Sequence, residues 1–261
     1  MKILILGHKG MLGRTVQKFF TRQDKFETLT VNARFGDPEF ETNIIKTEAD
    51  FIINCIGKIP QKQPTPQDYT QVNTELPRFL DTLNISTILP TTDCEFKGDI
   101  PAGESYTKSS PRDADDDYGL SKAIISKEIE ENSKNTKIIR TSIIGHEEAT
   151  TLALLDWFLS QSGSVRGYTN HYWNGITTLE WAKQCQKIIE NWSDFPTLNQ
   201  LGTTKHYSKF NIISMAKDIY KKDIEITPFA TEQAVNKCLA SDTILPELDV
   251  QLAELKEFFK K

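Results

Sequence analysis

Residues 2–14 read KILILGHKGMLGR, an apolar run followed by three glycines, Gly7, Gly10 and Gly13. The run predicts a buried strand, and the residues after the last glycine begin an amphipathic pattern of helical period. Between a strand and a helix, the first glycine permits a tight turn. The second lets the backbone approach a pyrophosphate, and the third lets the helix pack closely on the sheet. The free N–H groups at the helix N-terminus then face the phosphates.

This stretch therefore predicts a dinucleotide site, although a glycine-rich turn without a ligand stays open as the alternative. The spacing is G-x-x-G-x-x-G, whereas most dehydrogenases have G-x-G-x-x-G. The residues expected at the cofactor are Gly7, Lys9, Gly10, Met11, Leu12 and Gly13.

Strand and helix patterns alternate through the first 145 residues. Short apolar runs at residues 2–6, 28–31, 51–54, 86–90 and 136–140 predict strands that are covered on both faces. Residues 11–22, 68–83 and 117–132 predict helices between them. This rhythm predicts an α/β fold, a Rossmann-type doubly wound parallel sheet over residues 1–150.

The rhythm changes after residue 145. Helices are expected at residues 150–161, 178–190 and 208–221, a short strand at 224–227 and an amphipathic tail at 250–261. These elements predict that residues 151–261 form mainly a small mixed α/β cap that binds substrate. The chain is expected to return to the first domain around residues 174–195.

Composition and charge exclude several classes of protein. The formal net charge of −5 over 261 residues argues against a nucleic-acid partner, which needs a basic face. The N-terminal apolar run is too short for a signal peptide, and no stretch approaches the roughly 18 apolar residues of a membrane span. A cytoplasmic protein without a membrane partner is expected. Its four cysteines are far apart, which predicts reduced thiols and no metal site.

The end of the second predicted strand bears on the choice of cofactor. An NAD enzyme usually has an acidic residue there, which binds the ribose 2′-hydroxyl. Here the strand leads into Asn32, Ala33 and Arg34, and the first acid is Asp37. Because an arginine suits a 2′-phosphate, NADP(H) is favoured and NAD(H) stays open.

Tyr118 and Lys122 are four residues apart and fall on one face of a predicted helix. A phenol with a free pKa of about 10 is a weak acid at neutral pH. A nearby ammonium and an oxidised nicotinamide both favour phenolate, so they are expected to lower the pKa of Tyr118. Thr92 follows another strand, where its hydroxyl can bond to the oxygen that Tyr118 protonates.

Together these motifs resemble the extended short-chain dehydrogenase/reductases. The resemblance is greatest to the dTDP-4-dehydrorhamnose reductase branch and covers the first 145 residues well. The residues that carry it are Gly7, Gly10, Gly13, Asn54-Cys55-Ile56-Gly57, Val72-Asn73, Thr92-Asp93-x-x-Phe96-x-Gly98, Tyr118-x-x-x-Lys122 and Arg140-Thr141-Ser142.

The resemblance implies a catalytic triad of Thr92, Tyr118 and Lys122 acting on a nucleoside diphosphate sugar. It also implies products that enter surface polysaccharide. The further residues expected along the cofactor are Asn54, Cys55, Ile56, Gly57, Asn73, Thr141 and Ser142. A homodimer is possible on the same ground, but the metal-assisted dimer contact of the rhamnose enzymes has no signature here.

The motif departs from the family pattern next to the catalytic hydroxyl. Cys94 and Glu95 replace the usual aromatic–aliphatic pair, which is expected to place an acid beside the active centre. Basic and aromatic residues in the second half are candidates for holding the substrate, because arginine and lysine bind phosphate and aromatic rings stack on bases or sugars. The substrate candidates are Asp93, Glu95, Arg166, Tyr168, Trp173, Asn174 and Lys209.

The predicted reaction is NADPH-dependent reduction of a keto group on a deoxy-sugar nucleotide. A sugar-nucleotide epimerase or dehydratase with tightly bound NAD would use the same Tyr–Lys pair. A non-catalytic dinucleotide sensor is a third reading, but such proteins typically lose the tyrosine or the lysine. Both are present here.

Overall fold

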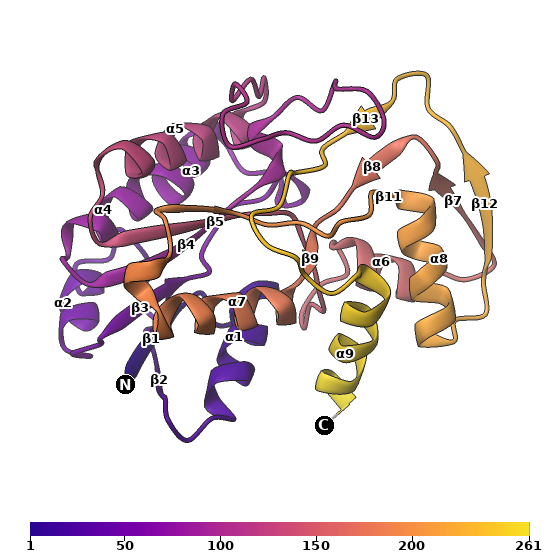
Figure 1. Ribbon diagram of the computed structural model, residues 1–261. Helices are drawn as coiled ribbons and strands as arrows, with labels where there is room; N and C mark the ends of the chain where they lie inside the picture. The colour runs from indigo at the N-terminus through magenta and orange to yellow at the C-terminus, as the bar shows by residue number, and fades with distance from the viewer. Residues whose placement is uncertain (261) are drawn as a thin grey trace.

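The computed structural model describes residues 1–260, and its centre is a six-stranded sheet in which all neighbouring strands are parallel (Figure 1). The strand order is β10-β5-β4-β3-β1-β2, which confirms the predicted doubly wound fold. The strands are β1 (Lys2–Leu6), β2 (Glu27–Thr30), β3 (Phe51–Asn54), β4 (Ser86–Thr91), β5 (Thr136–Arg140) and β10 (Leu198–Gln200).

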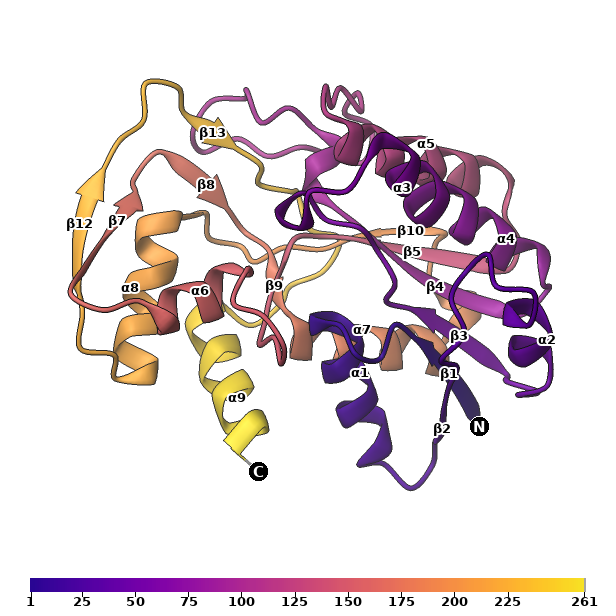
Figure 2. The ribbon, with the colours of Figure 1, turned by 180° about the vertical axis from the view of Figure 1, so that it is seen from behind.

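Helices cover both faces of this sheet, as Figures 1 and 2 show. On one face, α1 (Met11–Thr21) and α7 (Thr178–Glu190) bury an apolar core with β1, β3 and β4. On the other face, α2 (Phe40–Ile45), α4 (Leu76–Thr82) and α5 (Asp117–Asn132) form the second core. Since both faces are covered, the strands are apolar on both sides, as their sequences indicate.

The helix predicted at residues 68–83 is interrupted. It consists of α3 (Pro66–Tyr69), a π-helical segment (Thr70–Glu75) and α4. The π-helical segment contains the buried Asn73, whose side chain bonds to both main-chain groups of Lys58. Such π segments are frequent at functional sites, and this one lies beside the loop that follows β3.

The second lobe has small sheets around a core of its own. The strands are β6 (Ile143–Ile144), β7 (Ser164–Tyr168), β8 (His171–Trp173), β9 (Ile176–Thr177), β11 (Tyr207–Ser208), β12 (Glu225–Phe229) and β13 (Val235–Asn236). Its helices are α6 (Leu154–Ser160), α8 (Lys209–Tyr220) and α9 (Leu248–Lys260). They share the core that lies beneath these strands. Within residues 1–260, no helix is long and apolar enough to cross a membrane.

Most predicted elements are present, with local differences that have physical causes. The helix predicted at residues 150–161 begins only at Leu154, because the Glu147 carboxylate accepts the N–H groups of Leu152 and Ala153 in a loop. The tail predicted at residues 250–261 begins at Leu248, and Lys261 lies outside the described residues. The elements that were not predicted are α2, β10 and the short strands β6, β7, β8, β9, β11 and β13.

The glycine turn after β1 depends on two missing side chains. Gly7 has a φ of 76°, a region that residues with a β-carbon rarely adopt. A β-carbon on Gly13 would lie 2.2 Å from the carbonyl oxygen of Gly7. Helix α1 can therefore pack against the turn only with glycine at this position.

We expect Gly13→Ala to lower the free energy of unfolding by about 3 kcal/mol, at the upper end of the usual effect of overpacking. Gly10→Ala is the matched control. A β-carbon on Gly10 meets only the Gly7 oxygen, at 3.4 Å, and the Gly10 backbone has a φ of −83°. Thermal unfolding followed by circular dichroism compares the two variants. Equal melting temperatures would show that the close contact does not stabilise the fold.

Candidate functional site

A cavity of about 520 Å³ lies at the carboxyl ends of the parallel strands, between the large sheet and the second lobe. Ligands of open α/β sheets bind at this edge, where the strand order reverses. The predicted site residues that line it are Gly10, Met11, Leu12, Cys55, Ile56, Gly57, Thr92, Asp93, Tyr118, Lys122, Thr141, Ser142, Trp173 and Lys209. Residues from the glycine turn, from the loops after β3, β4 and β5 and from the second lobe therefore meet in one space.

The end of the cavity at the glycine turn fits a dinucleotide. Gly10 is exposed there, and a side chain on it would point into open space with only the Gly7 oxygen near. Helix α1 begins at the next residue, so its free N–H groups open on the same space. Trp181 of α7 also lines the cavity, and its buried indole N–H has no partner within residues 1–260. A donor in this position can be satisfied by an acceptor atom of a bound ligand.

Five other predicted cofactor residues lie outside the cavity, in the glycine turn and near the loop that follows β3. Gly7 and Gly13 shape the turn, and Lys9 is exposed. Asn54, at the end of β3, accepts the N–H of Ile56, and Asn73 holds Lys58. These two amides fix the loop through Gly57 from below.

Asn32 and Arg34 lie beyond the end of β2, where both are exposed. Val31, Ala33 and Phe35 alternate with them and pack against the core. Asn32 lines a second, open pocket near α2, which also contains Lys46. The structure therefore keeps the two predicted residues on the solvent side of an extended segment.

Thr92, Tyr118 and Lys122 come from two elements that pack together. Thr92 caps the 3₁₀ turn Asp93–Glu95 by accepting the N–H of Cys94, and its hydroxyl donates to Asp93 at 3.0 Å. Tyr118 and Lys122 lie one turn apart in α5, whose N-cap Asp116 accepts the N–H of Gly119. A β-carbon on Gly119 would lie 2.2 Å from the carbonyl oxygen of Cys94, so α5 lies directly against this turn.

The phenol of Tyr118 is held in its protonated form by the protein's own groups. Burial raises its pKa, and the nearby Cys94 and Asp93 raise it further. A hydrogen bond with Thr92 acts in the opposite direction. The expected lowering of this pKa by Lys122 and an oxidised nicotinamide stays a prediction for the complex with cofactor.

Lys122 itself is buried, and burial lowers its pKa to about 8. Its ammonium donates to the carbonyl oxygen of Pro90 at 3.4 Å. The charge of Glu95 acts in the opposite direction and raises this pKa, so the lysine keeps most of its charge at neutral pH.

The second lobe supplies the opposite wall. Trp173 and Lys209, both predicted, line it together with His171 and Lys237, which sequence reasoning missed. Burial raises the pKa of Asp93, while the charges of Lys237 and Lys209 lower it. The two lysines therefore lie within electrostatic reach of the residue after Thr92. Lys237 is missed because nothing around it in the sequence resembles a site.

Four predicted substrate residues do not line this cavity. Glu95 is fully buried and pairs with Arg140 and Arg112. Asn174 is buried, and its amide group bonds to main-chain groups of Thr203 and Leu239. Each of these two side chains is engaged in holding the protein together.

Arg166 and Tyr168 lie on the exposed side of β7. The guanidinium of Arg166 lies over the ring of Phe229, and Tyr168 packs against Phe229 and His171. Alternation along the strand directs both side chains away from Ile213 in the core, against which the intervening Gly167 packs.

Residues 1–238 match the protein family described as the RmlD substrate binding domain. The chain belongs to this family. No curated protein matches it. Membership in the RmlD family confirms the resemblance to the dTDP-4-dehydrorhamnose reductase branch of the short-chain enzymes. The chain is accordingly a short-chain reductase that acts on a nucleotide sugar.

Solved structures share the fold of this RmlD family member over nearly the whole chain. The dTDP-4-dehydrorhamnose reductase of Clostridium acetobutylicum is 18% identical, covers 100% of both chains and has a TM-score of 0.80. That of Bacillus anthracis, in complex with NADP, is 15% identical, covers 98% of both chains and has a TM-score of 0.82. The UDP-glucose 4-epimerase of Thermus thermophilus, in complex with NAD, is 12% identical, with coverage of 100% and 99% and a TM-score of 0.76.

We expect Gly10→Val to abolish dinucleotide binding and to leave the fold intact. Its β-carbon would lie at the start of α1, where the only neighbour within 4 Å is the Gly7 oxygen at 3.4 Å. Loss of two hydrogen bonds to a charged group corresponds to at least about a hundredfold loss of affinity. Fluorescence titration with NADPH measures the affinity, and circular dichroism checks the fold. Unchanged binding would mean that the loop is only a turn.

Proposed function

We propose that this chain catalyses NADPH-dependent reduction of a keto group on a deoxy-sugar nucleotide. The observation that supports this most is that Thr92, Tyr118 and Lys122 line the same cavity as the glycine turn. A carbonyl bound between them would lie within reach of both a proton donor and a dinucleotide. Such a place in sugar-nucleotide metabolism fits the supply of building blocks for surface polysaccharide.

Each of the three residues has a distinct part in the proposed reaction. Tyr118 donates the phenolic proton to the carbonyl oxygen as that oxygen gains negative charge. Thr92 would turn its single hydroxyl proton from Asp93, to which it donates in this structure, toward the same oxygen. Lys122, close to Gly57 in the cofactor loop, binds the nicotinamide ribose and stabilises the phenolate that forms. Burial helps at the start because it keeps Tyr118 in the acid form.

The dinucleotide would lie from the glycine turn to Thr141 and Ser142, and when bound it supplies the hydride. The protein's contribution is position and electrostatics. The charged wall of the second lobe suits the diphosphate of the substrate, since Lys209 and Lys237 provide two ammonium groups on the cavity side.

The alternative proposal is an epimerase or dehydratase that keeps NAD bound. The fold is compatible with it, because an epimerase is among the structures that share it. Arg34 is exposed, and no acidic residue stands between the end of β2 and Asp37. Both features favour NADPH as the cofactor and hence the reductase. Prolonged dialysis separates the two, since a reductase releases its cofactor and an epimerase retains it.

Removal of the phenolic hydroxyl in Tyr118→Phe is expected to lower turnover by about 10²–10⁴-fold, the usual contribution of a positioned acid. Cofactor affinity should change little, because the ring and its packing remain. Lys122→Met should lower both turnover and cofactor affinity. Thr92→Val should lower turnover by about tenfold to a hundredfold, as expected for one hydrogen bond to the reacting oxygen.

The assay is NADPH oxidation with a panel of nucleoside diphosphate keto-sugars. Tyr69→Phe is the matched control, because Tyr69 is a buried tyrosine whose ring centre lies 6.0 Å from that of Tyr118. It does not line the cavity. Wild-type turnover in Tyr118→Phe would rule out the short-chain mechanism.

We also expect NADPH to bind more tightly than NADH and Arg34→Ala to weaken only NADPH, by about tenfold to a hundredfold, as for a hydrogen bond to a charged group. Lys46→Ala is the companion variant, because Lys46 lines the pocket that contains Asn32. Fluorescence titration of both variants with NADPH and NADH shows which of the two side chains is responsible for the preference for NADPH. Equal affinity of the wild type for NADPH and NADH would contradict the cofactor proposal.

A further inference from the structure

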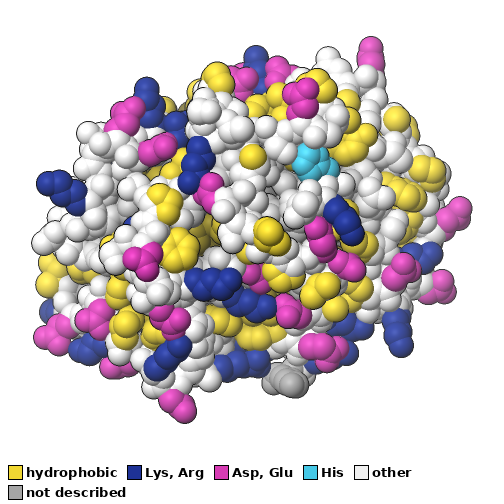
Figure 3. Space-filling model, viewed as in Figure 1, with side chains coloured by type: hydrophobic (Ala, Val, Ile, Leu, Met, Phe, Trp, Pro, Cys, Tyr) yellow, Lys and Arg dark blue, Asp and Glu magenta, His cyan; other side chains and the backbone are white. Residues whose placement is uncertain are grey.

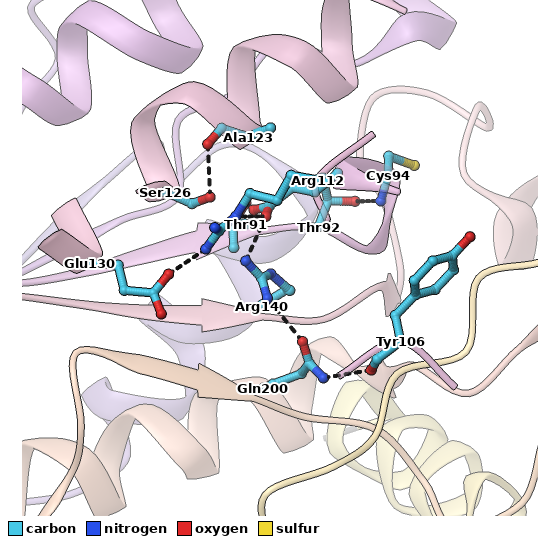
Figure 4. Close-up of polar contacts among 11 residues, drawn as sticks. Thr91, Thr92, Cys94, Tyr106, Arg112, Ala123, Ser126, Glu130, Arg140 and Gln200 are labelled. Atoms are coloured by element: carbon cyan, nitrogen blue, oxygen red, sulfur yellow. Dashed lines mark hydrogen bonds and ion pairs between the residues drawn. The ribbon is translucent and has the colours of Figure 1, made fainter. Parts of the chain in front are cut away.

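A cluster of four charged side chains, Glu95, Arg112, Glu130 and Arg140, lies near Thr92, and its centre, Glu95 and Arg140, is buried (Figure 4). Glu95 accepts hydrogen bonds from Arg140 at 2.7 Å and from Arg112 at 2.9 Å, and it also bonds to the hydroxyl of Thr91. Arg112 bonds in turn to Glu130 of α5. Both Glu95 and Arg140 are fully buried. The cluster is neutral overall, and Glu95 is its member in the 3₁₀ turn that follows Thr92.

Glu95 and Lys122 hold the same short piece of chain from two sides. The ammonium of Lys122 bonds to the carbonyl of Pro90, and the next residue, Thr91, bonds through its hydroxyl to Glu95. The ammonium of Lys122 and the carboxylate of Glu95 therefore bond to neighbouring residues at the end of β4. The two side chains do not pair directly, and within residues 1–260 Lys122 has no carboxylate partner in contact.

Of the charged groups around Lys122, Glu95 is the one that acts as its counter-charge. In the described chain, burial and Glu95 are the two influences that act on the pKa of Lys122, and Glu95 raises it. The carboxylate thus opposes the desolvation that would remove the ammonium. Helix α5 packs against α3, the π-helical segment, α4, the turn Asp93–Glu95 and β5. The charged and titratable groups on α5 and these elements, apart from Lys122 itself, are Asp68, Tyr69, Glu75, Arg78, Asp81, Asp93, Cys94, Glu95, Asp117, Tyr118, Lys127, Glu128, Glu130, Glu131, Lys137 and Arg140.

We propose that Glu95 is a positioning residue that acts through Lys122, keeping its ammonium charged and fixing the strand end that carries Thr92. This rests on the proposed function, in which Lys122 binds the dinucleotide ribose. It also gives a use to a residue that departs from the family pattern, where an aliphatic side chain would leave Lys122 without a counter-charge. The carboxylate itself stays outside the cavity and touches neither cofactor nor substrate.

The experiment must remove the carboxylate without leaving a buried guanidinium unpaired. Glu95→Gln with Arg140→Gln does so, because the two residues pair with each other and Arg112 keeps Glu130. Arg112→Gln is the matched control, since it removes a partner of Glu95 but keeps the carboxylate. Glu95→Asp tests whether a shorter carboxylate restores the wild-type behaviour.

The direct readout is the pKa of Lys122 in protein labelled with ¹³C at the lysine ε-carbon. Lys122→Met assigns its NMR signal. An opposite charge favours the charged form, so the double variant should titrate lower than Arg140→Gln, which lacks the same guanidinium but keeps the carboxylate. We expect a shift of about half a pH unit, less than the one to three units of a direct ion pair. Arg112→Gln and Glu95→Asp should titrate as the wild type does.

The second readout is the affinity for NADPH as a function of pH. Affinity should fall as the pH rises through the pKa of Lys122, near 8 in the wild type, and this fall should occur at lower pH in the double variant than in Arg140→Gln. A purely structural cluster would instead weaken binding equally at every pH in the double variant and in Arg112→Gln. An equal pKa of Lys122 in the double variant and in Arg140→Gln would overturn the proposal.

The two readouts separate this proposal from the proposed function. If no nucleotide bound at any pH but the lysine titration shifted as expected, the dinucleotide function would be wrong and the role of Glu95 toward Lys122 would stand. If NADPH bound and the titration of Lys122 did not shift, the dinucleotide function would stand and the role of Glu95 toward Lys122 would be wrong.

Discussion

The close contact between Gly13 and Gly7 is the constraint on which the site depends. Because no β-carbon separates them, the start of α1 lies against the end of β1. Helix α7 then packs on α1, where the hydroxyls of Thr15 and Thr178 bond at 3.0 Å. The second lobe is attached through α7 and the short strands before it, so this contact also sets where its wall meets the sheet. A single added methyl group at Gly13 would disturb every later step of this assembly.

Polar side chains connect the lobes where the apolar cores end. Gln200 of β10 accepts from Arg140 and donates to the carbonyl groups of Tyr106 and Ala240, and Asn174 bonds to main-chain groups of two further segments. Figure 4 shows Arg140 between Arg112 and Gln200. Figure 3 shows acidic and basic side chains interspersed over the face of Figure 1, so the concentrated charge lies inside. Within the described residues the Nε of Arg140 is the one buried side-chain atom of this network without a partner, and the other bonds favour one arrangement of the loops around the cavity.

The sequence predicts the parts of the fold that repeat a simple pattern. Strands β1, β3 and β5 and helices α5 and α7 begin and end where their periodicity indicates. Strands β6, β8, β9, β11 and β13 are missed because two or three residues carry no period, and β10 is missed because Leu198–Gln200 is mostly polar. The proposed catalytic residues belong to motifs and line the cavity, whereas Lys237 and His171 line it from segments without any motif. Glu95 and Asn174 were misplaced because a sequence does not show which polar residue is paired internally.

Burial acts on the two central residues in opposite senses, and this sets the protonation state of the site. It raises the pKa of the phenol of Tyr118 and lowers that of the ammonium of Lys122, so each is driven toward its neutral form. A neutral phenol is what a reductase needs as its acid, but a neutral lysine would bind neither ribose nor phenolate well. A negative charge is therefore needed near Lys122 but not near Tyr118. A carboxylate in direct contact with Tyr118 would raise its pKa still further. Glu95, placed behind Thr91 and away from the cavity, supplies negative charge to Lys122 while Arg112 and Arg140 hold that charge in place.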